Sequence, residues 1–308
     1  MKLNPLQVAA LLAAAALSSP ALAQSTVTIG GRLDLAAAKP VGSANKQLAD
    51  GFGSRLVFRG SEDLGGGLRA VFLLDHRFAP DTGTANATFW NGESVVGLQG
   101  GFGRVLLGRT YTSAWQLTQN TIDPFGGDTI AALRGVGLQI APARMRLPDQ
   151  VRYDFFGKGF NVAADIAEAD LALGPDRPYS VAANFTVGAL FVTVAHENPG
   201  GARDKLSTVG VRFAVGPVVL RAGTSRGTNN AGAKVEGILV GASAAVGPGQ
   251  LLAGFATNET AGRSNVRKAA FGYRYPLSTR TTLYADVARD SKAARDKTGY
   301  DLGIQHNF

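Results

Sequence analysis

The last nine residues of the chain alternate between apolar and polar side chains, and the chain ends on an aromatic residue. The two alternating sets are Tyr300, Leu302, Ile304, His306 and Phe308, and Asp301, Gly303, Gln305 and Asn307. A period of two predicts a β-strand with one apolar and one polar face. Such a strand suits a membrane β-barrel, whose outer face meets lipid and carries aromatic girdles. This segment alone leaves open the edge strand of a soluble sandwich.

The N-terminus carries the pattern of a secretory signal peptide. Lys2 supplies a positive charge, Leu6 to Leu17 form an apolar run, and the run is followed by Pro20-Ala21-Leu22-Ala23, which ends in the small-x-small pattern of a cleavage site. We therefore predict a signal peptide over residues 1–23 and a mature chain that starts at Gln24. An N-terminal membrane anchor is the alternative, but the apolar run is short for a membrane span.

The mature part of the chain contains no apolar run of about 18 residues, the length that would indicate a transmembrane helix. The exported protein is therefore expected either to be soluble or to cross a membrane as strands. Cysteine is absent, which excludes disulfides, thiolate catalysis and cysteine metal sites. The net charge is +8, but the basic residues are spread along the chain. No basic run with interleaved aromatics indicates a nucleic-acid groove, so the charge favours a solvated surface, anionic headgroups or an anion-attracting channel.

Short alternating segments separated by Gly, Asn, Asp and Pro follow one another along the whole mature chain, which is the all-β pattern. Strands are predicted at 26–37, 54–60, 68–77, 92–99, 103–110, 149–157, 159–168, 179–187, 189–197, 205–215, 217–226, 234–246, 250–258, 265–275, 280–289 and 299–308. These are about sixteen strands, most of them near the ~10 residues that a tilted strand needs to cross a bilayer. The fold class is therefore predicted as all-β, a single transmembrane antiparallel β-barrel over residues 24–308.

The predicted connections alternate in length. Tight Gly and Pro turns, such as 100–103 and 247–249, alternate with longer polar connections. The longer connections are 198–204, 227–233, 259–264 and 290–298. Short turns at one rim and long loops at the other are typical of outer-membrane barrels.

The longest connection, residues 112–148, contains no regular strand pattern. A loop of this length inside a compact domain usually has a function. It carries both acidic and basic residues, with Gly126-Gly127 at a predicted bend. We expect this loop to fold into the barrel, narrow the bore and help to set its charge.

Five segments together resemble a known family. They are 54–70 (SRLVFRGSEDLGGGLRA), 101–109 (GFGRVLLGR), 151–154 (VRYD), 275–285 (YPLSTRTTLYA) and 298–308 (TGYDLGIQHNF). They resemble general diffusion porins of β-proteobacteria, the trimeric sixteen-stranded Gram-negative porins. The resemblance implies a homotrimer in the outer membrane, in contact with its lipid and lipopolysaccharide, with the third external loop folded into each pore. It also implies periplasmic chaperones and a terminal strand, with Tyr300 and Phe308, that is read by the barrel-assembly machinery.

The resemblance also implies positions for pore-lining residues. Arg55 and Arg146 fall where anion-preferring members of this family place pore-lining arginines. A further arginine is expected near Gly92, where this chain has Asn91-Gly92-Glu93. The predicted pore-lining and constriction residues are Arg55, Arg59, Arg69, Arg77, Arg109, Asp123, Asp128, Arg134 and Arg146.

The sequence therefore predicts a water-filled channel for passive diffusion of small hydrophilic solutes and ions, with a preference for anions. The histidines lack the spacing of a metal site, and no nucleophile elbow is present, so we expect neither an enzyme nor a metal or other cofactor. The alternative is a non-porous barrel with an adhesion or structural role. Long aromatic-rich external loops would favour that alternative, whereas one very long loop among short ones favours a channel.

Overall fold

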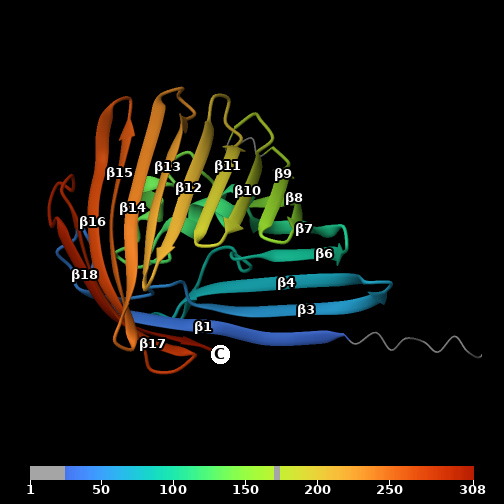
Figure 1. Ribbon diagram of the computed structural model, residues 1–308, viewed down its shortest axis with the longest axis horizontal. Helices are drawn as coiled ribbons and strands as arrows, with labels where there is room; N and C mark the ends of the chain where they lie inside the picture. The colour runs from blue at the N-terminus through green and yellow to red at the C-terminus, as the bar shows by residue number, and fades with distance from the viewer. Residues whose placement is uncertain (1–24, 170–173) are drawn as a thin grey trace, which may run out of the picture.

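The computed structural model describes residues 25–169 and 174–308, so the predicted signal peptide lies outside the described residues. Within them, sixteen long antiparallel strands close into a barrel, and two short strands, β2 (Gln47–Ala49) and β5 (Thr84–Ala85), lie in connections. The barrel and the helical segment inside it are seen in Figure 1. The predicted fold class, a sixteen-stranded barrel with a loop inside the pore, is confirmed.

The wall strands follow one another around the barrel in chain order. They are β1 (Thr26–Lys39), β3 (Arg55–Gly65), β4 (Leu68–Ala79), β6 (Ser94–Gly100), β7 (Gly103–Tyr111), β8 (Arg146–Phe156), β9 (Phe160–Ala167), β10 (Tyr179–Val187), β11 (Leu190–Asn198), β12 (Lys205–Val215), β13 (Val218–Thr228), β14 (Lys234–Val246), β15 (Gly249–Thr260), β16 (Arg263–Pro276), β17 (Thr281–Asp290) and β18 (Thr298–Asn307). Among the described residues, no helix has both the length and the apolar character required to cross a membrane.

The barrel closes between its first and last strands. β1 pairs with β18 from Arg32 opposite Asn307 to Lys39 opposite Tyr300. Beyond that ladder, Phe308 and Gly31 exchange two backbone hydrogen bonds of 3.0 and 3.1 Å. The ring of Phe308 lies where a side chain at position 31 would stand, so glycine is required there for the close approach. Closure leaves most of the sheet without a free edge, as a wall surrounded by hydrocarbon requires.

The two faces of the wall differ as the alternation predicts. On β18, Leu302 and Ile304 are exposed on the outer face, whereas Asp301 is buried on the inner face. On β17, Leu283 is exposed and Tyr284 is buried. The outer face is thus an apolar surface for lipid, and the inner face carries polar and charged side chains.

The connections alternate as expected, with two differences. Two-residue turns such as Gly216-Pro217 define one rim, and longer connections define the other. However, residues 259–264, predicted as a longer connection, form a two-residue turn in which Ala261 and Gly262 have φ angles of 51° and 76°. Positive φ angles at both central residues are typical of a type I′ hairpin turn. The polar residues around this turn led to the prediction of a longer connection. β8 begins at Arg146 rather than at 149, so the long loop spans residues 112–145.

Candidate pore constriction

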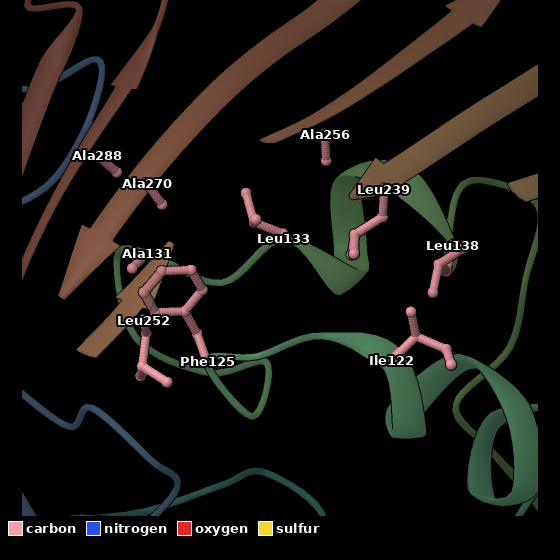
Figure 2. Packing of buried hydrophobic residues seen from close by; sticks show 10 residues of the cluster. All are labelled: Ile122, Phe125, Ala131, Leu133, Leu138, Leu239, Leu252, Ala256, Ala270 and Ala288. Carbon is pink, nitrogen blue, oxygen red and sulfur yellow. The ribbon is translucent and has the colours of Figure 1, made fainter. Parts of the chain in front are cut away.

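The long loop between β7 and β8 lies inside the barrel (Figure 1). It contains a π-helical turn, η1 (Trp115–Gln119), and two short helices, α2 (Asn120–Ile122) and α3 (Arg134–Gly137). Apolar side chains of the loop pack on the inner wall of β14 to β17 (Figure 2). The loop contributes Ile122, Phe125, Ala131, Leu133 and Leu138, and the wall contributes Leu239, Leu252, Ala256, Ala270 and Ala288. This apolar contact, unusual inside a pore, fastens the loop to one side of the bore.

Glycines in the wall let the loop approach closely. A Cβ at Gly254 would stand 2.5 Å from Cδ1 of Leu133, and a Cβ at Gly210 would stand 2.5 Å from Cγ1 of Ile122. Real carbon atoms do not pack at that separation, so a side chain at either position would displace the loop. The high glycine content of these strands is therefore in part a packing requirement of the loop.

Three acidic side chains of the wall hold the backbone or side chains of the loop. Asp165 of β9 accepts a hydrogen bond from the N–H of Ser113 at the start of the loop. Glu197 of β11 accepts bonds from Gln119 Nε2 at 2.5 Å and from the N–H of Arg144 at 3.2 Å. Asp301 of β18 accepts a bond from the N–H of Ile130 at 3.2 Å. The loop is thus tied along a large part of the wall, and the open passage remains on the side of β1, β3 and β4.

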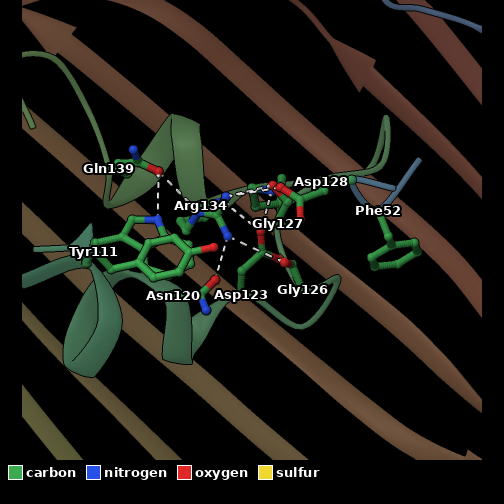
Figure 3. A network of polar contacts seen from close by, with 12 residues as sticks. Phe52, Tyr111, Asn120, Asp123, Gly126, Gly127, Asp128, Arg134 and Gln139 are labelled. Atoms are coloured by element: carbon green, nitrogen blue, oxygen red, sulfur yellow. Dashed lines mark hydrogen bonds and ion pairs between the residues drawn. The ribbon is translucent and has the colours of Figure 1, made fainter. Parts of the chain in front are cut away.

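Arg134 organises the interior of the loop (Figure 3). Its guanidinium donates to Asn120 Oδ1 at 2.5 Å, to the carbonyl oxygen of Gly127 at 3.0 Å and to Gln139 Oε1 at 3.2 Å. It also stacks over the Trp115 ring at 5.1 Å. Although the sequence predicts a pore-lining role for Arg134, the structure buries its side chain inside the loop, because these acceptors surround it.

The two acidic residues predicted for the constriction have different positions. The carboxylate of Asp123 is buried and accepts bonds of 2.7 Å from the N–H groups of Leu133 and Arg134. Burial raises the pKa of Asp123, while the backbone N–H groups act in the opposite direction. Asp128 is 39% exposed and pairs with Arg134 at 3.3 Å. Asp128 therefore faces the passage, whereas Asp123 lies inside the loop.

A row of three arginines faces the loop across the passage. Arg32 of β1 is the register partner of Arg55 of β3, and Arg55 is the register partner of Arg77 of β4. Arg77 is held by Asp75, with N···O distances of 3.0 to 3.2 Å, and donates to the hydroxyl of Tyr111 at 2.9 Å. Within residues 25–169 and 174–308, the side chain of Arg55 makes no hydrogen bond or ion pair. Arg55 therefore presents to the bore a guanidinium that no partner side chain holds, with Asp75 and Asp128 lining the same hollows.

The passage between this row and the loop is a hollow of about 650 Å³. The charged residues that line it are Arg32, Arg55, Arg77, Arg146 and Asp128. Arg146 lies over the ring of Tyr111 at 4.2 Å and donates to its hydroxyl at 2.5 Å. Tyr111 in turn stacks on Trp115 with ring centroids 4.1 Å apart. Four arginines against one aspartate make the lining of the passage positive.

The remaining predicted arginines lie away from this passage. Arg59 lines a neighbouring hollow of about 460 Å³ together with Arg55 and Asp75. Arg69 lies eight residues before Arg77 on β4, which separates the two by about 26 Å along the strand. Arg109 is not among the residues that line the passage, and its guanidinium donates to Asn91.

Position 92 cannot hold the arginine that the family pattern places near it. A Cβ on Gly92 would collide with the carboxylate of Asp75, the group that holds Arg77. The third arginine of the row comes instead from Arg32. Sequence reasoning missed Arg32 because nothing in the first strand shows that it pairs with Arg55. The local signal that it faces inward is its place two residues before Asp34, on the face opposite to Leu33.

A closed sixteen-stranded barrel with an apolar outer face and a charged bore narrowed by a loop is an outer-membrane pore protein. The chain belongs to the Gram-negative porin family, which matches residues 9–295. It is a channel of the outer membrane for the passive diffusion of hydrophilic solutes.

Individual relatives agree with this assignment. The chain is 29% identical over 347 residues to outer membrane porin protein 32 of Delftia acidovorans, covering 96% of this chain and 98% of the relative. It is 28% identical over 320 residues to an outer membrane porin of Bordetella pertussis, covering 83% and 82%. The solved anion-selective porin from Comamonas acidovorans superimposes with a TM-score of 0.77 at 25% identity, over 92% of this chain and 100% of that chain. OmpT of Vibrio cholerae in its trimer form has the same fold, with a TM-score of 0.73 at 13% identity over 92% of this chain and 99% of that chain.

Proposed function

We propose that this porin prefers anions and that Arg55 is the main residue behind the preference. The observation that carries the proposal is the position of Arg55, which has no ion-pair partner among the described residues and stands in the middle of the row that also contains Arg32 and Arg77. Positive walls in a confined, partly low-dielectric passage raise the local concentration of anions. The solved relative from Comamonas acidovorans, which is described as anion-selective, supports the same direction.

The mechanism is diffusion with weak and reversible contacts. The arginines of the passage attract a small anion, and they are spread over several strands rather than gathered around one point. A general pore must release what it admits, so contacts with several fixed charges in succession suit it better than one tight site. Transport then requires no covalent step, and we propose that the protein is not an enzyme.

We also propose how the protein is exported and assembled. Three copies form a homotrimer, as the trimer form of OmpT from Vibrio cholerae suggests. Removal of residues 1–23 precedes assembly, with periplasmic chaperones holding the chain. The terminal strand, with exposed Tyr300 and Phe308, is read by the barrel-assembly machinery. The apolar outer face contacts lipid and lipopolysaccharide.

Recording from the purified wild-type protein in planar bilayers tests the channel and its preference together. In a tenfold gradient around 0.1 M salt, the reversal potential is expected to indicate anions, because a fixed charge acts over a Debye length of about 10 Å there. The preference is expected to fade near 1 M salt. A reversal potential that indicates cations at low salt would contradict the proposed preference and leave the porin assignment intact. Folded protein without any conductance would favour the non-porous, structural alternative.

A further inference from the structure

The outer face of β12, β13 and β14 has an apolar hollow. Its volume is about 430 Å³, and its outward side chains include Val209, Val211, Ala222, Ile238 and Val240. Ala222 is the register partner of both Val211 and Val240, so a single methyl group stands between two larger side chains. Thr224 also borders the hollow, and its hydroxyl donates to the carbonyl of Gly237 at 2.9 Å. The hollow is therefore an almost purely apolar depression on the lipid side.

A basic hollow of about 520 Å³ adjoins the apolar one, and Arg226 lines both. Lys205 of β12 and Lys234 of β14 are both register partners of Thr228 of β13. The two lysines thus stand two strands apart on the same face, with about 10 Å between their backbones. Neither lysine has an ion-pair partner in the described part of the chain, and both are exposed.

Two carboxylates complete the surroundings of the basic hollow. Glu236 pairs with Arg226 at 2.6 Å, and Glu259 is the register partner of Glu236. They lie one row below the lysines, toward the middle of the membrane. The pair leaves Arg226 70% exposed. The hollow therefore presents Lys205 and Lys234 as free cations at its outer end.

The position of these hollows selects one leaflet. Lys205, Thr228 and Lys234 adjoin the longer connections 199–204 and 229–233, whereas the other ends of β12 and β13 meet at Gly216-Pro217. Long loops mark the external rim of an outer-membrane barrel, so the basic hollow lies at the level of the outer-leaflet headgroups. Lipopolysaccharide is the anionic lipid of that leaflet. These strands also lie across the ring from β1, β3, β4 and β6.

We propose that the paired hollows form a binding site for the lipid A part of lipopolysaccharide, with a phosphate between Lys205 and Lys234 and an acyl chain over Ala222. The site rests on the outer-membrane lipid contact proposed above. The negative charge of a phosphate complements the two ammonium groups. The acyl chain fills a depression that acyl chains lying along a flat barrel wall would leave poorly packed. Ala222 and Arg226 are four residues apart, so the two parts of the site are separated by about 13 Å along β13.

The phosphate contact is tested by titrating bis-phosphorylated lipid A onto purified, folded protein and counting bound lipid by native mass spectrometry. Each basic side chain near an anionic headgroup contributes about 1 kcal/mol, which is about fivefold in affinity. The double variant Lys205→Gln/Lys234→Gln is therefore expected to bind lipid A about 25-fold more weakly. The matched control, Lys158→Gln/Arg280→Gln, removes the same charge from exposed residues in turns at the opposite rim and is expected to bind as the wild type does. Equal weakening in both double variants would overturn the proposal.

The acyl contact is tested with Ala222→Trp, which fills the hollow without changing the charge. It is expected to weaken lipid A binding severalfold, whereas Ala285→Trp, on the exposed outer face of β17, is expected to have no effect. Phosphatidylglycerol serves as a competitor, and displacement of lipid A at equal concentration would overturn the assignment to lipid A. Conductance in planar bilayers is expected to be unchanged in every variant, so loss of the lipid site is distinguishable from loss of the pore.

Discussion

Arg55 and Arg77 stand directly opposite each other on β3 and β4, both facing the bore. Like charges in register destabilise a sheet, so this pair opposes folding. Asp75 holds Arg77 with a bidentate contact and reduces the repulsion, while Arg55 has no ion-pair partner among the described residues. A barrel that tolerates this cost at its narrowest part presents positive charge to the solutes that pass.

Neutralising Arg55 is expected to reduce the anion preference. In Arg55→Gln, the anion-to-cation permeability ratio should fall severalfold at 0.1 M salt, and Arg55→Glu should shift the channel toward cations, because the central charge of the row is removed or reversed. The measurement is the reversal potential in a salt gradient. Arg69→Gln, about 26 Å along the wall from Arg77, is the control. An equal effect of both glutamine variants would show that the total charge, not its position, sets the preference.

Removing the carboxylate that compensates Arg77 is expected to act in the opposite direction. Asp75→Asn keeps the shape of the side chain but frees the charge of Arg77, so the anion preference at 0.1 M salt should rise. Near 1 M salt, where the Debye length is about 3 Å, the variant and the wild type should converge. Asp63→Asn, near the end of β3 and far from Arg77, provides the control. A fall in anion preference in Asp75→Asn would mean that Arg77 has left the passage.

Loosening the apolar contact of the loop is expected to change the current and leave the barrel intact. Leu133→Ala removes a fully buried side chain between the loop and the wall, at a cost of about 2–5 kcal/mol to docking of the loop. Single-channel records should show larger conductance or added noise, and limited proteolysis should cut within residues 112–145. Leu107→Ala, on the outer face, is the control. If Leu133→Ala showed the conductance and noise of the wild type and its loop were not cleaved, the hydrogen bonds to Asp165, Glu197 and Asp301 would suffice to hold the loop.

A larger change in the same loop tests its role as the constriction. Deletion of about ten residues around Gly126 should increase the conductance of correctly assembled protein, because it removes Asp128 and the segment facing the arginine row. Single-channel conductance and heat-modifiable electrophoretic mobility measure the pore and the barrel separately. Unchanged conductance in folded protein would place the constriction elsewhere.

The orientation of the terminal strand is tested by placing a charge on either face. Leu302→Arg puts a charge toward lipid, at a cost of about 2–4 kcal/mol near the midplane, so the yield of folded barrel should fall. Gln305→Arg puts the same charge into the wet bore and should assemble normally. Gly303 cannot serve as this control, because a Cβ there would collide with Tyr284. Equal yields for Leu302→Arg and Gln305→Arg would contradict the assigned register.

Most of the fold could be predicted from the sequence, because its signals are local. Alternation identifies each strand and its two faces, as in Leu302 and Asp301, and Gly and Pro mark the tight turns. The missed turn at Ala261 shows the limit, since an alanine with positive φ carries no local signal. The candidate site was predicted less completely. Arg55, Arg77, Asp128 and Arg146 line the passage, and Arg59 lines the neighbouring hollow instead. The other four predicted residues, Arg69, Arg109, Asp123 and Arg134, line neither.

The sequence by itself determined an exported, cysteine-free, alternating chain of barrel strands with one long inward loop, because periodicity and turn chemistry are properties of neighbouring residues. Only the tertiary structure decided which charges meet. The row of Arg32, Arg55 and Arg77 depends on pairing between strands far apart in the chain, and a strand's register is set by the whole sheet. The burial of Arg134 depends on acceptors that the folded loop brings together. Charge along the chain is a local property, whereas the charge of a pore is the sum over side chains that closure of the barrel places around one passage.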